Sequence, residues 1–283
     1  MIFEQLIKAH DQEVKDGINE LFDVAFANQL DENDMLLVTS HCHRMENWKD
    51  IDLSEISPFV VGVGVVGHEE HNFYEFYHEY RQQYYDKDVF DAANSEEKEK
   101  AERLTINIEF MIYLKLWEND AFLRRIFNLV RLCNKDYYRW DFKPDVFDSR
   151  ERLIRNKIMQ RVKKLCPKFY ALLEEIYIPQ LRGAFAHNKY FFSGKYISIT
   201  NKNYRDGFDL GSILIDDWYK VFNKSVLLYN HYLGALQRYK EFYITKAKEH
   251  HNGLGIYTPE ENPRTGGKTQ RFLNWDGREF RWA

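Results

Sequence analysis

Apolar side chains recur every three or four residues over long stretches of this chain, which is the spacing of one face of an α-helix. The pattern is clearest from Leu104 to about Cys133 and from Ser149 to Leu165, and it returns from Ser212 to about His250. Asn72 to Tyr85 shows the same period in an aromatic-rich segment. The sequence therefore predicts a mainly α fold, whose long helices pack most simply as a bundle.

Turn-forming residues divide the helical pattern into separate elements. Pro167 and Pro179 each suit the first turn of a helix, because proline fixes φ and has no N–H to donate. After the second of these helices, YFFSGKYISI predicts two short strands around Ser193-Gly194. We expect Ser212 to cap the last long helix.

The chain is expected to contain three consecutive regions. Residues 1–94 make an acidic, mostly helical N-terminal region, and residues 95–250 make a helical bundle with a small β-hairpin insertion. Residues 251–283 lose the helical period, and Asp276-Gly277 between aromatic segments predicts a terminal β-hairpin in this extension.

Composition favours a folded, reduced protein. Hydrophobic residues make up 44% and aromatic residues 16% of the 283 positions, which is enough for a substantial core. No stretch approaches the ~20 apolar residues of a membrane span, and the N-terminus lacks a signal-peptide pattern, so we expect a cytoplasmic protein without membrane contact. Cys42, Cys133 and Cys166 are odd in number and far apart, which predicts buried thiols rather than disulfides.

Charge is distributed unevenly along the chain. Of its 40 Lys and Arg and 44 Asp and Glu, residues 1–100 carry 8 and 23, which leaves 32 and 21 for residues 101–283. Between Ser149 and Lys168 the acidic residues are reduced to Glu151 alone, against eight Lys and Arg. This predicts a surface for a polyanion such as RNA, with a shielding or regulatory partner surface on the acidic part. Differently solvated faces of one globule are the alternative.

Two further patterns suggest ligands but lack the surrounding structure that those ligands need. Gly62, Gly64 and Gly67 have the spacing of a dinucleotide-binding loop, but no alternation of strands and helices surrounds them. A buried turn or strand is therefore favoured over a nucleotide-binding regulator. Four histidines could bind zinc: His41 and His43 beside Cys42, and His68 and His71 after the glycines. The sequence has neither paired cysteines nor the histidine spacing of metalloproteases. We expect no metal and no cofactor.

The segment LRGAFAHNKYFF carries a pair of residues suited to RNA cleavage. The guanidinium of Arg182 can hold two phosphate oxygens, and the imidazole of His187 can move a proton near neutral pH. Five positions on a helix separate two side chains by about 140°, so they converge only if the helix ends between them or if two chains combine. Asn188 suits a helix end.

This segment, placed between an apolar helix and a strand-turn-strand, resembles the signature of the HEPN superfamily over about residues 95–250. The resemblance implies a four- to five-helix bundle, and in many members a metal-independent endoribonuclease of toxin, antiviral-defence or RNA-processing systems. It also implies a homodimer in which two motifs form one site. Arg182 and His187 match the ends of the motif, and Asn188 matches the residue that often follows the histidine.

The resemblance gives roles to named residues. Arg182 is expected to hold the scissile phosphate, His187 to act as general base or acid, and Asn188 to orient it. Independently of the resemblance, the charge of the basic helix predicts RNA binding by Arg152, Arg155, Arg161, Lys163 and Lys164. Tyr190 in the following hairpin is a candidate for stacking on bases, and packing in the hairpin core is the favoured alternative. Gly183 departs from the polar residue that often follows the arginine. It either admits the RNA backbone or marks a catalytically inactive interaction or RNA-binding module, which is the alternative function.

Overall fold

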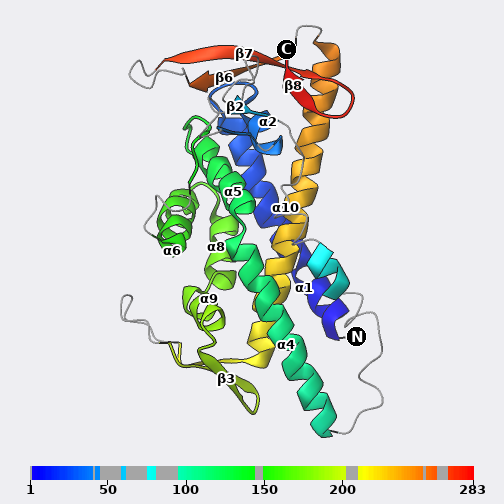
Figure 1. The fold of residues 1–283 in the computed structure, drawn as a ribbon, viewed down its shortest axis with the longest axis vertical. Helices are drawn as coiled ribbons and strands as arrows, with labels where there is room; N and C mark the ends of the chain where they lie inside the picture. The colour runs from blue at the N-terminus through cyan, green and yellow to red at the C-terminus, as the bar shows by residue number, and fades with distance from the viewer. Residues whose placement is uncertain are drawn as a thin grey trace, which may run out of the picture. The chain divides into compact units, whose positions relative to one another are not determined.

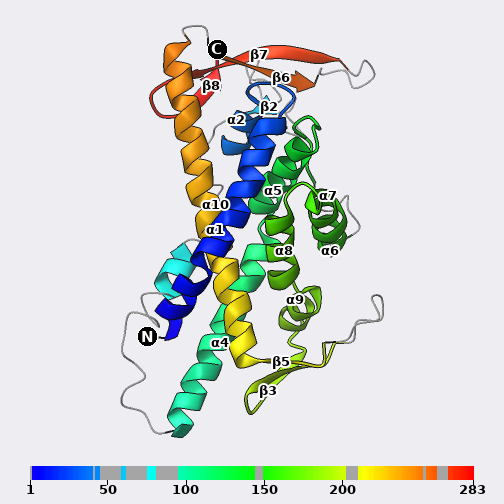
Figure 2. The same ribbon diagram turned by 180° about the vertical axis from the view of Figure 1, so that it is seen from behind.

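The computed structural model describes residues 2–40, 42–44, 59–61, 75–80, 95–143, 149–201, 210–250, 253–259 and 267–283 (Figures 1 and 2). Over these residues the chain is mainly helical, with small antiparallel sheets. The predicted mainly α class is therefore confirmed. The three consecutive regions predicted from the sequence, with boundaries at residues 94 and 250, stay a prediction.

The helices are α1 (Ile2–Asn28), α2 (Asp34–Thr39), α4 (Ser95–Glu118), α5 (Asp120–Cys133), α6 (Arg150–Arg152), the π-helix η3 (Leu153–Met159), α7 (Gln160–Val162), α8 (Pro167–Ile176), α9 (Pro179–Ala186) and α10 (Ile215–Glu249). Residues 75–80 are also helical. The strands are β1 (His43–Arg44), β2 (Phe59–Val60), β3 (Tyr190–Ser193), β4 (Tyr196–Ile199), β5 (Ser212–Leu214), β6 (Leu254–Pro259), β7 (Lys268–Trp275) and β8 (Phe280–Trp282). They form the antiparallel sheets β1-β2, β3-β4-β5 and β6-β7-β8.

Contacts group the chain into two compact units, each assembled from three separate stretches. Unit 1 comprises Met1–Asp16, His68–Asn119 and Ala171–Asn230. Unit 2 comprises Gly17–Gly67, Asp120–Tyr170 and His231–Ala283. This grouping follows spatial contact rather than chain order, and the Arg182–His187 motif belongs to unit 1.

An aromatic cluster between α4, α9 and α10 forms the core of unit 1. Phe110 stacks on Phe185 with ring centroids 3.5 Å apart, and Trp218 meets both rings edge-on. The Tyr113 hydroxyl donates to the last carbonyl of α8 and accepts from the N–H that precedes α9, at 2.9 and 3.1 Å. These contacts hold α9 in place, because α4 fixes both its aromatic side chain Phe185 and its N-cap residue Ile178.

The sheet β3-β4-β5 follows α9 directly in the chain and leads into α10 (Figure 2). Its inner face adds Tyr190 and Phe192 to the aromatic cluster around Phe110. Ser212 lies on β5, where it pairs with Ser198, so the expectation that it caps the last helix is wrong. Residues 212–214 are alternately exposed and buried, and they form a third strand beside the β3-β4 pair. For this reason α10 begins only at Ile215.

The long apolar stripe predicted up to Cys133 is divided into two helices. α4 ends at Glu118 and α5 begins at Asp120, with the Asn119 N–H bonded to the carbonyl of Leu116. An acidic residue in a first turn is favourable beside the positive end of a helix dipole, which suits Asp120 to a new start.

The part of α1 that follows Asp16 contributes to the core of unit 2. Ile18, Leu21 and Phe22 of α1 are fully buried, and the Phe22 ring stacks on Tyr239 of α10. The Glu20 carboxylate accepts from the first N–H groups of α8, at 2.8 and 3.1 Å. Deleting residues 1–94 would therefore expose this core, whether or not the acidic charges shield a basic surface.

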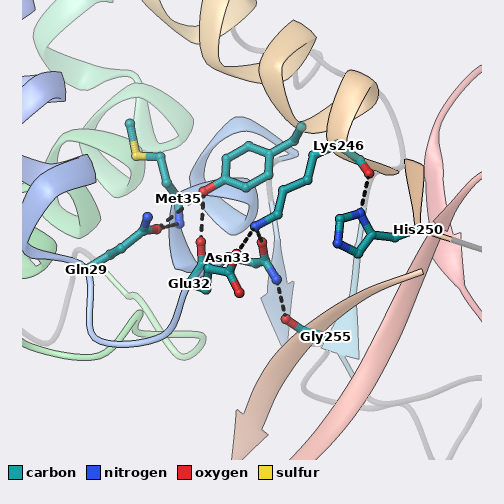
Figure 3. Close-up of polar contacts among 8 residues, drawn as sticks. Gln29, Glu32, Asn33, Met35, Lys246, His250 and Gly255 are labelled. Carbon is teal, nitrogen blue, oxygen red and sulfur yellow. Dashed lines mark hydrogen bonds and ion pairs between the residues drawn. The ribbon is translucent and has the colours of Figure 1, made fainter. Parts of the chain in front are cut away.

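Unit 2 also contains a hydrogen-bonded junction between the α1–α2 loop, α10 and β6 (Figure 3). The buried amide of Asn33 donates to the carbonyl of Gly255 at 2.8 Å and accepts from Lys246 at 2.9 Å. Lys246 also pairs with Glu32 at 2.5 Å. This hydrogen bond, and to a smaller extent the positive charge of Lys246, lowers the pKa of the Glu32 carboxyl. The polar groups here satisfy one another, which indicates a structural role.

The glycines and most of the histidines considered as ligand sites cannot be compared with the structure, whereas the cysteines can. Gly62, Gly64, Gly67, His41, His68 and His71 lie outside the described residues, and for His43 the backbone alone is described. All three cysteines are buried, as predicted, with the Cys133 and Cys166 sulfurs 3.9 Å apart. Among the described helices, none is long and apolar enough to cross a membrane.

Candidate functional site on helix α9

Helix α9 ends between Arg182 and His187, in a turn that places Asn188 in the left-handed region. Pro179 occupies the first turn, Ala186 is the last helical residue and His187 is the C-cap. The N–H groups of Asn188 and Lys189 bond back to the carbonyls of Phe185 and Ala184, at 3.4 and 2.7 Å. These are the two bonds of a Schellman motif, in which the left-handed residue is usually Gly or Asn. The φ of Asn188 is 53°, so its position is explained by the helix end.

Replacing Asn188 separates this structural role from the predicted catalytic one. We expect Asn188→Val to lower the free energy of unfolding by about 1–2 kcal/mol, because a β-branched side chain tolerates a left-handed backbone poorly. Asn188→Gly is expected to leave stability unchanged or slightly higher. Urea unfolding of both variants checks this. If Asn188→Gly keeps its stability but loses RNA cleavage, the amide side chain acts in the site after all.

Arg182 is held by an acidic residue that the sequence did not single out. Its guanidinium Nη1 donates to the carboxylate of Glu118, the last residue of α4, and the two helices pack against each other. The side chains are 22% and 41% exposed, so the pair lies at the surface of unit 1. Glu118 ends an apolar stripe 64 residues before Arg182, and no local pattern connects the two positions.

His187 lies at the surface, at the C-terminal end of α9. Its N–H still bonds to the carbonyl of Gly183, four residues back, but its φ of −111° marks it as the C-cap at which the helix ends. Five helical positions correspond to a rotation of about 140° between the two side chains. The imidazole is exposed, and within the described residues it makes no hydrogen bond or ion pair. Within the described residues, Arg182 bonds to Glu118, and no hydrogen bond or ion pair joins it to His187.

Gly183 allows a close approach between α9 and the end of β4. A Cβ at this position would lie 3.2 Å from the amide nitrogen of Asn201, and that amide donates to the carbonyl of Gln180 at 3.0 Å. The buried Gln180 side chain in turn bonds to the backbone of Asn201 and Leu210, with its shortest bonds at 2.7 Å. The absence of a side chain at Gly183 thus has a structural reason, and Gln180 and Asn201 are anchoring residues that the sequence did not reveal.

Tyr190 faces inward from β3. Its ring meets Phe110 edge-on with centroids 4.8 Å apart, and its hydroxyl donates to Asn107 at 2.8 Å. Burial raises the pKa of this hydroxyl above its usual value. Packing in the core accounts for Tyr190 without RNA, whereas its neighbour Phe191 is 54% exposed.

The basic residues predicted to bind RNA lie on α6, η3 and the segment around α7, in unit 2. Arg155 pairs with Glu151 at 3.4 Å, and Arg161 pairs with Asp136 at 2.5 Å. Lys163 is exposed and its ammonium lies 4.9 Å from the ring centroid of Tyr170. Arg152 and Lys164 are exposed as well. Asp136 lies outside the Ser149–Lys168 segment, so its pair with Arg161 adds one negative charge that the sequence count of this segment did not include.

The described residues contain no group of three or more His, Cys, Asp and Glu side chains arranged to hold a metal ion. Compared with known proteins, the chain matches no described family, no curated protein and no solved structure. The function must therefore be argued from the residues of the candidate site.

Proposed function

We propose that this protein is a metal-independent endoribonuclease of the toxin or phage-defence type, with Arg182 and His187 from two copies forming one site. The proposed scaffold is a four- to five-helix bundle of the HEPN type, with β3 and β4 inserted after the motif. The observation that carries the proposal is the exposed imidazole of His187 at the end of α9, five residues from an arginine that is 22% exposed.

The geometry of α9 is the reason for requiring two copies. Five positions along a helix turn a side chain by about 140°, and no described contact joins Arg182 to His187, which supports assigning the two groups at one phosphate to two copies. Two α9 helices meeting around a symmetry axis place the His187 of each copy near that of the other, because a two-fold interface uses the same patch on both chains. Such a site has one imidazole for each of the two proton transfers.

The proposed reaction balances with these groups alone. One neutral His187 takes the proton of the ribose 2′-OH while the 2′-oxygen forms a bond to phosphorus. The bond from phosphorus to the 5′-oxygen breaks, and the protonated His187 of the other copy donates its proton to that leaving oxygen. The products are a 2′,3′-cyclic phosphate and a 5′-hydroxyl. Arg182 stabilises the negative charge on the non-bridging oxygens through its planar pair of donors.

Glu118 competes with RNA for Arg182 in this scheme. An ion pair as exposed as this one contributes about 0–1 kcal/mol, so a phosphate that offers two oxygens can displace the carboxylate. We expect Glu118→Gln to strengthen RNA binding several-fold and to change the free energy of unfolding by less than about 1 kcal/mol. Fluorescence anisotropy with labelled RNA and urea unfolding measure the two effects. A clear loss of stability without tighter binding would make the pair a structural tie.

The direct test is incubation of the wild-type chain with mixed single-stranded and structured RNA in EDTA. Cleavage with 2′,3′-cyclic phosphate ends is expected, since neither proton transfer nor phosphate binding uses a metal in this mechanism. Sedimentation analysis of the same sample determines whether the active species is a dimer. Absence of cleavage by a folded dimer overturns the proposal.

One observation favours a second function, a catalytically inactive dimer that serves as an interaction or RNA-binding module. The Arg182–Glu118 pair joins the end of α4 to α9, and Gly183 fits Asn201 closely, so both residues have structural explanations. In that case, Arg182→Ala lowers stability and wild-type protein does not cleave RNA.

A further inference from the structure

We propose that the solvent-facing side of the β3-β4-β5 sheet binds single-stranded RNA, with unpaired bases stacked on Phe191 and Tyr196. This inference rests on the proposed function and specifies its substrate class as RNA whose bases are not held in a duplex.

The register of the sheet places these two rings on one face. Phe191 is opposite Ser198, and Tyr196 is opposite Ser193 on one side and Leu214 on the other. Residues directly opposite in an antiparallel pair point to the same face, and so do residues two apart along a strand. Phe191, Tyr196 and Leu214 therefore share one side, while Tyr190, Phe192 and Ile197 point to the core.

The exposed side is apolar at its centre and polar at its rim. Phe191 is 54%, Tyr196 48% and Leu214 38% exposed. Tyr196 and Leu214 are direct cross-strand neighbours, and Phe191 is diagonal to Tyr196, within reach of an aromatic side chain. Hydroxyl groups surround the rings, from Ser193, Ser198 and Ser212. A grouping of exposed apolar side chains with a polar rim marks a binding surface.

Charge complementarity selects RNA as the occupant. No Asp or Glu occurs between Pro179 and Arg205, a stretch that contains Arg182, Lys189 and Lys195. Lys189 precedes β3 and Lys195 lies in the β3–β4 turn, and both are exposed. A cationic strand pair with exposed rings fits a chain of phosphates and bases, because each base offers a π-face and each phosphate a negative charge. Acidic residues return in the sequence at Asp206 and Asp209, which precede β5, and again at Asp216 and Asp217 in the first turn of α10.

The chain connects this surface directly to the proposed site. Phe191 follows His187 by four residues, a contour length of at most about 14 Å. A strand whose scissile phosphate lies at His187 can therefore place neighbouring bases on the sheet. Stacking on a protein ring requires bases that are free to turn outward, as in single strands and loops. The surface thus favours unpaired RNA over duplex RNA.

The test compares RNA binding by ring variants in a His187→Ala background, which prevents cleavage during the measurement. The probes are a short fluorescein-labelled RNA of mixed sequence and the same strand annealed to its complement, measured by anisotropy. Phe191→Ala and Tyr196→Ala are each expected to weaken binding of the single strand about tenfold and to leave duplex binding unchanged. Phe191→Tyr, which keeps a ring, is expected to restore affinity to within about twofold.

Matched controls separate stacking from other uses of an exposed apolar surface. Leu214→Ala removes apolar area from the same face without removing a ring, and Phe272→Ala removes an exposed ring from β7 in unit 2. Leu214→Ala is expected to weaken single-strand binding far less than the two ring variants do, and Phe272→Ala is expected to bind RNA like the parent. An equal loss with Leu214→Ala, or a lower assembly mass of Phe191→Ala in sedimentation, would overturn the inference and assign this face to a second copy of the chain.

Cleavage assays with an intact His187 distinguish the two proposals. If wild type cleaves RNA and the double variant Phe191→Ala/Tyr196→Ala cleaves it with unchanged KM, the stacking surface is refuted while the ribonuclease stands. If the ring variants lose single-strand binding but wild type cleaves nothing, the surface stands and the ribonuclease is refuted.

Discussion

His187→Ala is expected to lower the rate of RNA cleavage by about 10²–10⁴-fold while leaving the free energy of unfolding within about 0.5 kcal/mol of wild type. The imidazole is exposed and makes no side-chain hydrogen bond within the described residues, so its removal breaks no described polar contact. In the proposed reaction, the imidazole of one copy accepts the 2′-OH proton and that of the other copy donates a proton to the leaving 5′-oxygen. Single-turnover cleavage and urea unfolding measure the two quantities on the same samples.

Arg182→Lys is the informative companion to this variant. Lysine keeps the positive charge and can still meet Glu118, but it lacks the planar pair of donors that binds two phosphate oxygens. We expect stability close to wild type and a cleavage rate reduced at least tenfold. Loss of stability in His187→Ala, or full activity in Arg182→Lys, would contradict the assigned roles.

Glu13→Gln combined with Glu175→Gln is expected to lower the free energy of unfolding of the protein by about 3 kcal/mol. Lys224 of α10 is 4% exposed, and its ammonium contacts Glu13 at 2.9 Å and Glu175 at 2.5 Å within unit 1. The variant leaves a buried ammonium without either carboxylate. Lys224→Met is the matched control. It is expected to cost about 1 kcal/mol or less, because the glutamates it leaves unpaired are 56% and 41% exposed.

The pH dependence of this effect has a definite sign. Burial by itself lowers the pKa of Lys224, but its hydrogen bonds to Glu175 and Glu13 outweigh burial and raise the pKa above its usual value. The contribution of the pair to stability is therefore complete below pH ~10.5 and is lost as pH rises through the folded pKa. Without the two carboxylates burial dominates, so the Gln variant should gain stability relative to Lys224→Met as pH rises toward 10.5. Urea unfolding from neutral to alkaline pH checks this difference, and equal losses in both variants at neutral pH would contradict the argument.

The sequence predicted local features of the chain with good accuracy. Pro167 and Pro179 begin helices, Ser149 caps α6 through a hydrogen bond from the Arg152 N–H, and α9 ends just before Asn188. Strands lie on both sides of Ser193-Gly194 and of Asp276-Gly277. These outcomes depend on the dihedral preferences and hydrogen bonds of neighbouring residues, which a sequence displays directly.

Only the tertiary structure decided which of the candidate residues have partners. Glu118 pairs with Arg182 although 64 residues separate them in the sequence, and the Asn201 side chain lies where a side chain at Gly183 would begin. Tyr190 points to the core, while its neighbour Phe191 points to solvent. Ser212 became a strand residue because β4 was available to pair with it. A sequence determines where a helix can begin and which of its faces is apolar. It does not display which distant groups close against that face, because this depends on how the whole chain packs.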